Sequence, residues 1–243
     1  MSTTGRFVAI ETSSSPGSVA VGTLSSQVRE ITFPPGGDHG RRLIPAVVQL
    51  TEDAGWPLAD VDLVSVAIGP GPFTGLRVGV TTAKAIAWAA DCPIAAIPTA
   101  ACLAAQAVAS GGPVSPVQIV FDAGRGELYA VTADPGESAE ATAVTEICWQ
   151  LDETGLVTPE AWQQGLPPEA LVTGPGLSLA EPVIAELPRH RPDLRIAPPE
   201  SWQPAAATVA RLGLAAADRH ELVDAAAVVP IYLRASYAEE RKV

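Results

Sequence analysis

Short apolar runs alternate with amphipathic segments along the first half of the chain. Two β-like runs, Phe7–Thr12 and Ser18–Leu24, flank a turn rich in Ser, Pro and Gly, which is typical of a hairpin. Gln27–Phe33 is a candidate third strand. The segment from His39 to Ala54 repeats apolar residues at helical spacing, and Leu63–Ile68 is a short, mostly apolar run that suits a buried strand. The pattern therefore predicts an α/β fold.

A Gly/Pro-rich loop separates the last of these strands from two further helices. Gly69-Pro70-Gly71-Pro72 cannot continue a strand, and Thr74 can cap a helix from Gly75 to Ala90. A second, Ala-rich helix follows Pro98-Thr99 and ends at Gly111-Gly112-Pro113. Strands and helices thus alternate through the first half of the chain.

The second half repeats this plan in the same order, displaced by roughly 100 to 110 residues. The matching features are the hairpin of Val117–Phe121 and Glu127–Thr132, the segment Leu171–Thr173 followed by Gly174-Pro175-Gly176, and Arg195–Ala197 followed by an Ala-rich helix from Pro204. Any single pair could arise by chance among α/β units, but the ordered set favours a duplicated lobe. We expect an N-terminal lobe at 1–112 and a C-terminal lobe at 113–243. The last helix of the C-terminal lobe is expected to pack back on the N-terminal lobe.

Two such lobes with acid-bearing hairpins resemble the fold shared by sugar kinases, actin and Hsp70 ATPase domains, the ASKHA or ribonuclease H-like fold. In ATPases of that fold, strand-end Asp residues and turn amides hold the nucleotide. Here the strand ends carry Glu11 and Asp122, and Arg125 follows the latter. These turns are predicted to be remnants of a nucleotide or phosphate site. The candidate residues are Glu11, Thr12, Ser13, Gly71, Thr74 and Asp122.

Composition and charge limit the classes of partner that the chain is expected to bind. The chain has 243 residues, 47% of them hydrophobic, and a formal net charge of −12, which disfavours direct binding of nucleic acid. Residues 1–120 carry 6 basic and 8 acidic side chains, whereas residues 121–243 carry 9 and 19. The first half is therefore the better place for a partner surface. The run Phe7–Ile10 is too short for a signal peptide, and no apolar stretch is long enough to span a membrane, so we expect a cytoplasmic protein.

Catalytic and metal motifs are not apparent. His39, His190 and His220 are dispersed, and the sequence contains no H-x-x-x-H, H-E-x-x-H or G-x-S-x-G motif. The three cysteines include no C-x-x-C pair and are expected to be buried free thiols. We expect no catalytic residue, no metal and no cofactor bound by this chain alone.

The Gly/Pro-rich loop and the helix after it leave two questions open. The loop from Gly69 to Arg77 lacks the residues of a P-loop and the third glycine of a dinucleotide fingerprint, so it is either a rigid turn or an anion site at a helix N-terminus. The helix carries small residues at four-residue spacing, which permit close approach either to the chain's own sheet or to a helix of another chain. These residues are Gly75, Gly79, Ala83 and Ala87.

Several ordered segments of the chain resemble the TsaB (YeaZ) family. The segments are Phe7–Ser13, Ser18–Val21, Ile68–Ala87, Asp122–Tyr129 and Pro230–Arg234. The resemblance covers nearly the whole chain but is weak between Glu137 and Pro199. It departs from the family at Glu11, where Asp is usual, and at Pro72, where Ser is common.

The resemblance implies a non-catalytic subunit needed to form threonylcarbamoyladenosine next to the anticodon of tRNA. Family members are similar to an inactive form of the catalytic subunit TsaD, pair with TsaD through helices of the N-terminal lobe, and are joined by the ATPase TsaE. TsaD carries a His-x-x-x-His metal motif. In this chain His39 and Arg41 match the family, and no second His is in register. The resemblance further implies a homodimer when the chain is alone, only indirect contact with tRNA, no membrane contact, and ATP or ADP, if present, at the complex interface.

The resemblance also implies which surface docks. The predicted partner residues lie on the first two long helices and are His39, Arg41, Leu43, Val47, Arg77, Val78, Gly79 and Ala83. On this view Gly79→Leu disrupts the complex and leaves the fold intact. The alternative function is an ATP-dependent small-molecule kinase or ATPase of the two-lobe fold. A third class, a direct tRNA-binding module, is disfavoured by the net charge.

Overall fold

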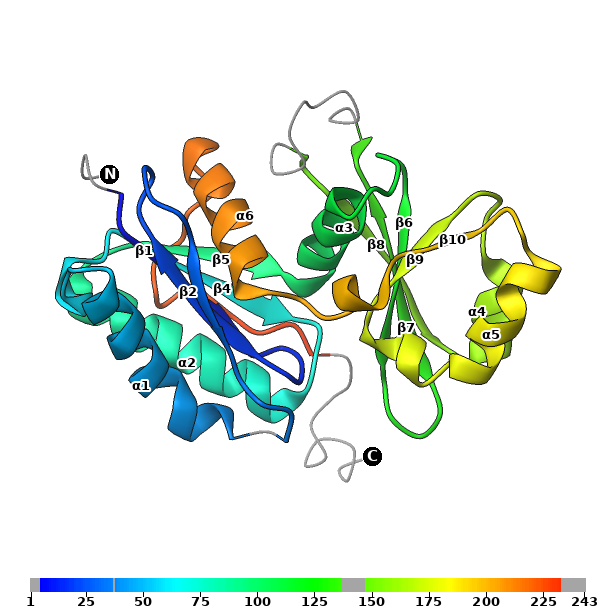
Figure 1. Ribbon diagram of the computed structural model, residues 1–243, viewed down its shortest axis with the longest axis horizontal. Coiled ribbons are helices and arrows are strands. Elements are labelled where there is room, and N and C mark those ends of the chain that lie inside the picture. The colour runs from blue at the N-terminus through cyan, green and yellow to red at the C-terminus, as the bar shows by residue number, and fades with distance from the viewer. Residues whose placement is uncertain (1–4, 37, 137–146, 233–243) are drawn as a thin grey trace. The chain divides into compact units, whose positions relative to one another are not determined.

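The computed structural model describes residues 5–36, 38–136 and 147–232. The chain forms two compact units (Figure 1), one of Met1–Cys102 with Gln203–Pro230 and one of Leu103–Trp202 with Ile231–Val243. Each unit contains its own five-stranded sheet. The division into domains at residue 112 stays a prediction.

The sheet of the first unit has the strand order β3-β2-β1-β4-β5. Its first three strands form an antiparallel meander, and β4 and β5 run parallel to β1 on its other side. All five residues of β1 and all but one of β4 are buried, as expected for central strands covered on both faces. The strands are β1 (Phe7–Glu11), β2 (Ser18–Gly22), β3 (Arg29–Thr32), β4 (Leu63–Gly69) and β5 (Ile94–Pro98).

Helices cover both faces of this sheet. Helices α1 (His39–Asp53) and α2 (Phe73–Ala90) lie on one face, where α1 packs on β2 and α2 on β4. Helix α6 (Ala206–Asp218) packs on β1, β2, β4 and β5, although it comes from the second half of the chain. A short 3-10 helix, η1 (Leu58–Asp60), precedes β4, and α3 (Thr99–Ala109) follows β5.

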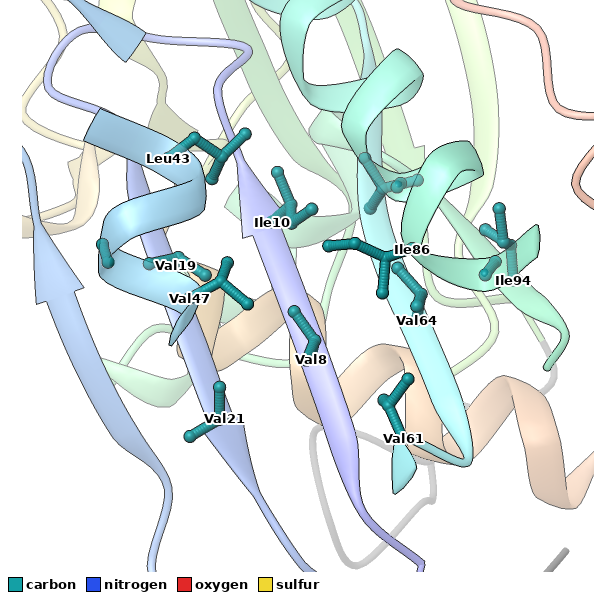
Figure 2. Packing of buried hydrophobic residues seen from close by; sticks show 14 of the residues in the cluster. Val8, Ile10, Val19, Val21, Leu43, Val47, Val61, Val64, Ile86 and Ile94 are labelled. Carbon is teal, nitrogen blue, oxygen red and sulfur yellow. The ribbon is translucent and has the colours of Figure 1, made fainter. Parts of the chain in front are cut away.

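Figure 2 shows the core between the sheet and helices α1 and α2. Alternate strand residues point to this face because successive side chains of a strand lie on opposite sides of the sheet. Burying one such side chain contributes about 1.5 to 3 kcal/mol, so the layer fixes both helices to the sheet. The labelled residues are Val8, Ile10, Val19, Val21, Leu43, Val47, Val61, Val64, Ile86 and Ile94.

The sheet of the second unit has the order β10-β9-β6-β7-β8. Its core is built around buried residues that include Val120, Trp162 and Leu177. The strands are β6 (Val117–Asp122), β7 (Leu128–Asp134), β8 (Gln150–Val157), β9 (Leu171–Thr173) and β10 (Arg195–Ile196). The helices are α4 (Pro159–Gly165), η4 (Pro175–Ser178), α5 (Glu181–His190) and η5 (Pro199–Ser201).

The two sheets have the same topology. In each, three strands form an antiparallel meander and two parallel strands follow on the other side of the first strand, so that β1 to β5 correspond in order to β6 to β10. The predicted fold, α/β with two duplicated ASKHA-like lobes, is confirmed. Strand β8 had no counterpart in the sequence analysis, because none of its residues is buried and Asp152, Glu153 and Thr154 at its centre are polar and exposed.

One expected helix start differs in detail. Helix α2 begins at Phe73, two residues before the predicted start, and Pro72 stands at its N-cap position without a side-chain cap. Thr74 is therefore an exposed residue of the first turn and does not cap the helix.

Candidate functional site

The turn between β1 and β2 holds a buried carboxyl group. Glu11 ends β1 and is fully buried. One carboxylate oxygen accepts hydrogen bonds from the Ser13 backbone N–H at 2.7 Å and from the Ser13 hydroxyl at 2.5 Å. The hydroxyl of Thr99, the first residue of α3, donates in turn to the Ser13 hydroxyl oxygen at 2.9 Å. A chain of three polar side chains thus runs from the end of β1 to the start of α3.

Three glycines of the Gly/Pro-rich loop and α2 pack directly on this turn. A Cβ atom at Gly71 would overlap the Ser13 carbonyl oxygen, and one at Gly75 would overlap the Thr12 carbonyl oxygen. A Cβ atom at Gly79 would overlap the Thr12 hydroxyl, which donates to the Gly75 carbonyl at 2.8 Å. In this structure the glycine row therefore serves close approach to the chain's own turn.

Burial governs the electrostatics of the turn. Desolvation raises the pKa of Glu11 to about 7, although its hydrogen bonds from Ser13 and Ser14 act in the opposite direction. Desolvation also lowers the pKa of His39, which stands at the start of α1 beside the turn. Burial therefore disfavours the charged form of both groups.

The turn already has an internal ligand. In a phosphate-binding turn, free backbone N–H groups point at the anion. Here the Ser13 N–H points at the carboxyl group of Glu11. One backbone donor that an incoming phosphate would use, the Ser13 N–H, is therefore engaged within the chain.

The predicted nucleotide-site residues fall into three environments. Glu11, Thr12, Ser13 and Gly71 come together at the turn of the first unit. Thr74 lies on the exposed side of the first turn of α2. Asp122 ends β6 in the second unit, where its carboxylate accepts the Gly124 N–H at 2.7 Å. The assignment of these residues to a vestigial site stays a prediction.

The predicted partner residues divide by exposure. Arg41 and Arg77 are exposed, Val78 is half-buried, and the Arg77 guanidinium lies 3.6 Å from the centroid of the Phe73 ring. The buried members are His39, Leu43, Val47, Gly79 and Ala83.

The buried members contact the chain itself. Leu43 and Val47 belong to the core of the first unit, and no room exists for a side chain at Gly79. The expectation that Gly79→Leu leaves the fold intact is therefore wrong. That α1 and α2 dock on a partner stays a prediction, and their outward residues are the ones that would meet it.

Those outward residues include large apolar side chains that the sequence analysis did not single out. Trp88 on α2 is 85% exposed, and Ile44 and Val48 on α1 are 43% and 37% exposed. A groove of about 300 Å³ runs beside α2 and is lined by apolar residues, Leu58, Ala59, Ala85, Ile86, Ala89 and Ala90. The sequence did carry a signal for Trp88, because its position does not follow the helical periodicity of the buried residues, which include Ile86 and Ala87.

Charge is distributed unevenly along the two helices. The starts of α1 and α2 are neighbours, since a Cβ atom at Gly75 would lie 3.7 Å from the His39 ring. Exposed Arg41, Arg42 and Arg77 lie near these starts, and exposed Glu52 and Asp53 close α1. The surface of the two helices therefore has a basic end and an acidic end.

Metal ligands, thiols and long apolar helices are the remaining features of the described residues that bear on chemistry or location. No group of three or more His, Cys, Asp or Glu side chains is placed to hold a metal ion there. Cys102 is buried and Cys92 half-buried as free thiols, whereas Cys148 is exposed, contrary to the expectation of burial. No helix in this part of the chain is long and apolar enough to cross a membrane.

Comparison with known proteins identifies the family. A family model described as "TsaD: tRNA N6-adenosine threonylcarbamoyltransferase" matches residues 35–166, more than half of the chain. The curated protein TsaB of Bacillus subtilis is 42% identical over 92 residues, which are 38% of this chain and 39% of that protein. The chain belongs to the family that this model describes, and it is similar to TsaB.

Further relatives of this TsaB-like chain agree with the assignment. TsaB of Escherichia coli is 30% identical over 124 residues, 51% of this chain and 53% of that protein. The solved structure of YeaZ from Pseudomonas aeruginosa, 24% identical, superposes with a TM-score of 0.72 over 94% of this chain and 99% of that one, which shows the same fold. The matched segments span about two fifths to one half of the curated TsaB relatives.

Proposed function

We propose that this chain takes part in the biosynthesis of threonylcarbamoyladenosine in tRNA as a non-catalytic subunit. In this proposal it binds and supports the catalytic subunit TsaD, and the ATPase TsaE joins the assembly. The main support is the naming of the B. subtilis and E. coli relatives as tRNA threonylcarbamoyladenosine biosynthesis proteins.

The occupied turn supports the non-catalytic role. The Ser13 N–H and hydroxyl hold the carboxyl group of Glu11, so a nucleotide phosphate would have to displace a buried side chain. We therefore propose that the chain alone binds no nucleotide at this turn. ATP or ADP, where it is needed, would bind at the interface of the complex.

The outer face of α1 and α2 supports the docking role. Exposed apolar side chains such as Trp88, Ile44 and Val48 are typical of the centre of an interface, and the arginines near the helix starts are suited to its rim. Contact with tRNA would then be made by another subunit, in keeping with the net charge of −12.

Sequence similarity to the proposed partner suggests how the two chains meet. The tRNA N6-adenosine threonylcarbamoyltransferase of Bifidobacterium longum is 48% identical to this chain over 56 residues, 23% of this chain and 16% of that protein. Two related helix pairs can pack about a pseudo-twofold axis, which places the basic end of one against the acidic end of the other. The same face would form a homodimer when TsaD is absent.

The composition of the complex tests this proposal. The chain is mixed with TsaD and TsaE from the same organism, with and without ATP, and the mass of each species is measured by size-exclusion chromatography with light scattering. A species that contains this chain and TsaD in equal numbers is expected, and the homodimer should disappear as TsaD is added. Separate elution of the two chains under all conditions would contradict the docking role.

A further inference from the structure

The chain leaves the first unit after Cys102, returns at Gln203 and leaves again after Pro230, and the first two of these connections are neighbours at their first-unit ends. The two connections are tied together on the first-unit side, where the Cys102 thiol lies 3.8 Å from the Ala205 carbonyl oxygen as a weak donor. Segments about 100 residues apart in sequence are thus neighbours within one unit.

The outgoing connection is anchored to the β1–β2 turn. Thr99 begins α3, and its hydroxyl donates to Ser13, whose hydroxyl donates to the carboxyl group of Glu11. All three side chains are buried. Breaking this chain of hydrogen bonds would leave desolvated polar groups without partners, which is unfavourable.

The returning connection is anchored to the neighbouring strands. The Ala206 N–H donates to the Ser18 hydroxyl at 2.8 Å, and the Ala207 N–H donates to a Glu30 carboxylate oxygen at 3.3 Å. These N–H groups belong to the first turn of α6, which has no acceptor for them within the helix. Ser18 is paired directly with Glu11 across the β1–β2 hairpin.

These contacts form one polar cluster, called here the crossover cluster. Its members are Glu11, Ser13, Ser18, Glu30, Thr99 and Cys102. The cluster holds the first-unit ends of both connections.

Glu11 is the member whose charge changes near neutral pH. Burial and the negative charge of Glu30 on β3 oppose its ionisation and raise its pKa to about 7. The other titratable groups around it are Cys102 on α3, whose pKa is raised by burial and by Glu11, and His39 on α1, whose pKa is lowered by burial. The positive charge of Arg211 on α6 acts in the opposite direction and lowers the pKa of Cys102.

We propose that the crossover cluster is a pH-responsive anchor of the two connections, closed when Glu11 is protonated and opened more often when Glu11 loses its proton to solvent. Opening admits water to the carboxylate and relieves its desolvation. The same event frees the Thr99 hydroxyl and the first turn of α6. Each connection therefore gains freedom as the pH rises through neutrality.

Amide hydrogen exchange measures the opening directly. The exchange rates of the Ala206 and Ala207 N–H groups in the whole protein are divided by their intrinsic rates at each pH. If the open state restores the ordinary Glu11 pKa of 4.5, the opening equilibrium rises about 30-fold between pH 5.5 and pH 8.5. The N–H groups of β6, which belong to the other unit, serve as an internal reference and should show no such rise.

Two variants test whether Glu11 and its hydrogen bonds cause the rise in opening with pH. Glu11→Gln should abolish the rise, and Thr99→Val, which breaks the hydrogen-bond chain, should increase opening at every pH. Glu52→Gln is the matched control, because Glu52 is exposed on α1, and it should keep the wild-type profile. A flat profile in the wild-type protein would overturn the proposal even if Glu11→Gln does not fold. An unchanged rise in a folded Glu11→Gln variant would overturn it as well.

Discussion

At the scale of single residues, the β1–β2 turn shows how burial changes chemistry. Glu11 stands where the fold usually presents an acid to a ligand, yet its carboxyl group is enclosed and bonded to Ser13. A carboxylate on the surface would favour its charged form at neutral pH, whereas this one is balanced between the two forms. The turn therefore stabilises the fold most when Glu11 is protonated.

The stability of the protein should therefore depend on Glu11. A folded-state pKa of about 7 against an ordinary 4.5 means that the stability present below pH 4.5 is lost as pH rises through 7. At pH 7.5 the Glu11→Gln variant should be more stable than wild type by about 3 kcal/mol, since it carries no charge to bury. Urea unfolding at pH 5.5 and 7.5 checks this, with Glu52→Gln as control. A variant equally or less stable than wild type at pH 7.5 would contradict the effect.

A second prediction at this scale concerns the glycine row. Gly79→Ala should destabilise the protein by about 1 to 3 kcal/mol, because the new Cβ atom overlaps the Thr12 hydroxyl. Gly40→Ala is the matched control, since Gly40 lies on the exposed face of α1 with nothing within 4 Å of an added Cβ. It should be neutral or stabilise by up to about 1 kcal/mol. Equal effects of the two substitutions, measured by thermal unfolding, would show that the close approach is unimportant.

At the scale of elements, the sequence located most of the secondary structure but not the contacts between elements. The apolar runs of β1, β2 and β4 and the small-residue spacing of α2 were readable, because burial on both faces leaves a strong pattern. Strand β8 was missed, since an exposed, polar edge strand has no such pattern.

The candidate site was only partly predictable for the same reason. Glu11, Thr12 and Ser13 were identified as strand-end residues, but the partner of each group depends on folding. The bond from Thr99 to Ser13 joins positions 86 residues apart. The sequence likewise could not show that Gly79 faces Thr12 or that Trp88 faces outward.

The docking role makes a prediction about the outer face of α1 and α2. Trp88→Ala and Arg77→Glu should each weaken binding to TsaD at least about tenfold, which corresponds to about 1.4 kcal/mol. Neither should unfold the chain, because both residues are exposed. Calorimetric titration with TsaD measures the affinity, and Leu156→Ala, which removes an exposed apolar side chain of the second unit, is the control. Wild-type affinity in both variants would show that the interface with TsaD lies elsewhere on the chain.

At the scale of the whole molecule, duplication explains the two matching sheets, whereas the net charge differs between the two halves of the sequence. The strand order of one sheet repeats in the other, but the half of the chain before residue 121 carries a net charge of −2 and the rest −10. The lightly charged half contains α1 and α2, whose exposed apolar side chains support a docking surface. Acidity elsewhere is compatible with an RNA-modification pathway in which another subunit contacts the RNA.

Reconstitution of the modification is the most direct test of the central claim. Purified TsaD and TsaE from the same organism are supplied with tRNA, ATP and an activated threonylcarbamoyl donor, and threonylcarbamoyladenosine is measured by mass spectrometry of the digested tRNA. The account predicts product only when this chain is added with TsaD, and none from this chain alone. Equal product formation without this chain, or product from this chain in the absence of TsaD, would contradict it.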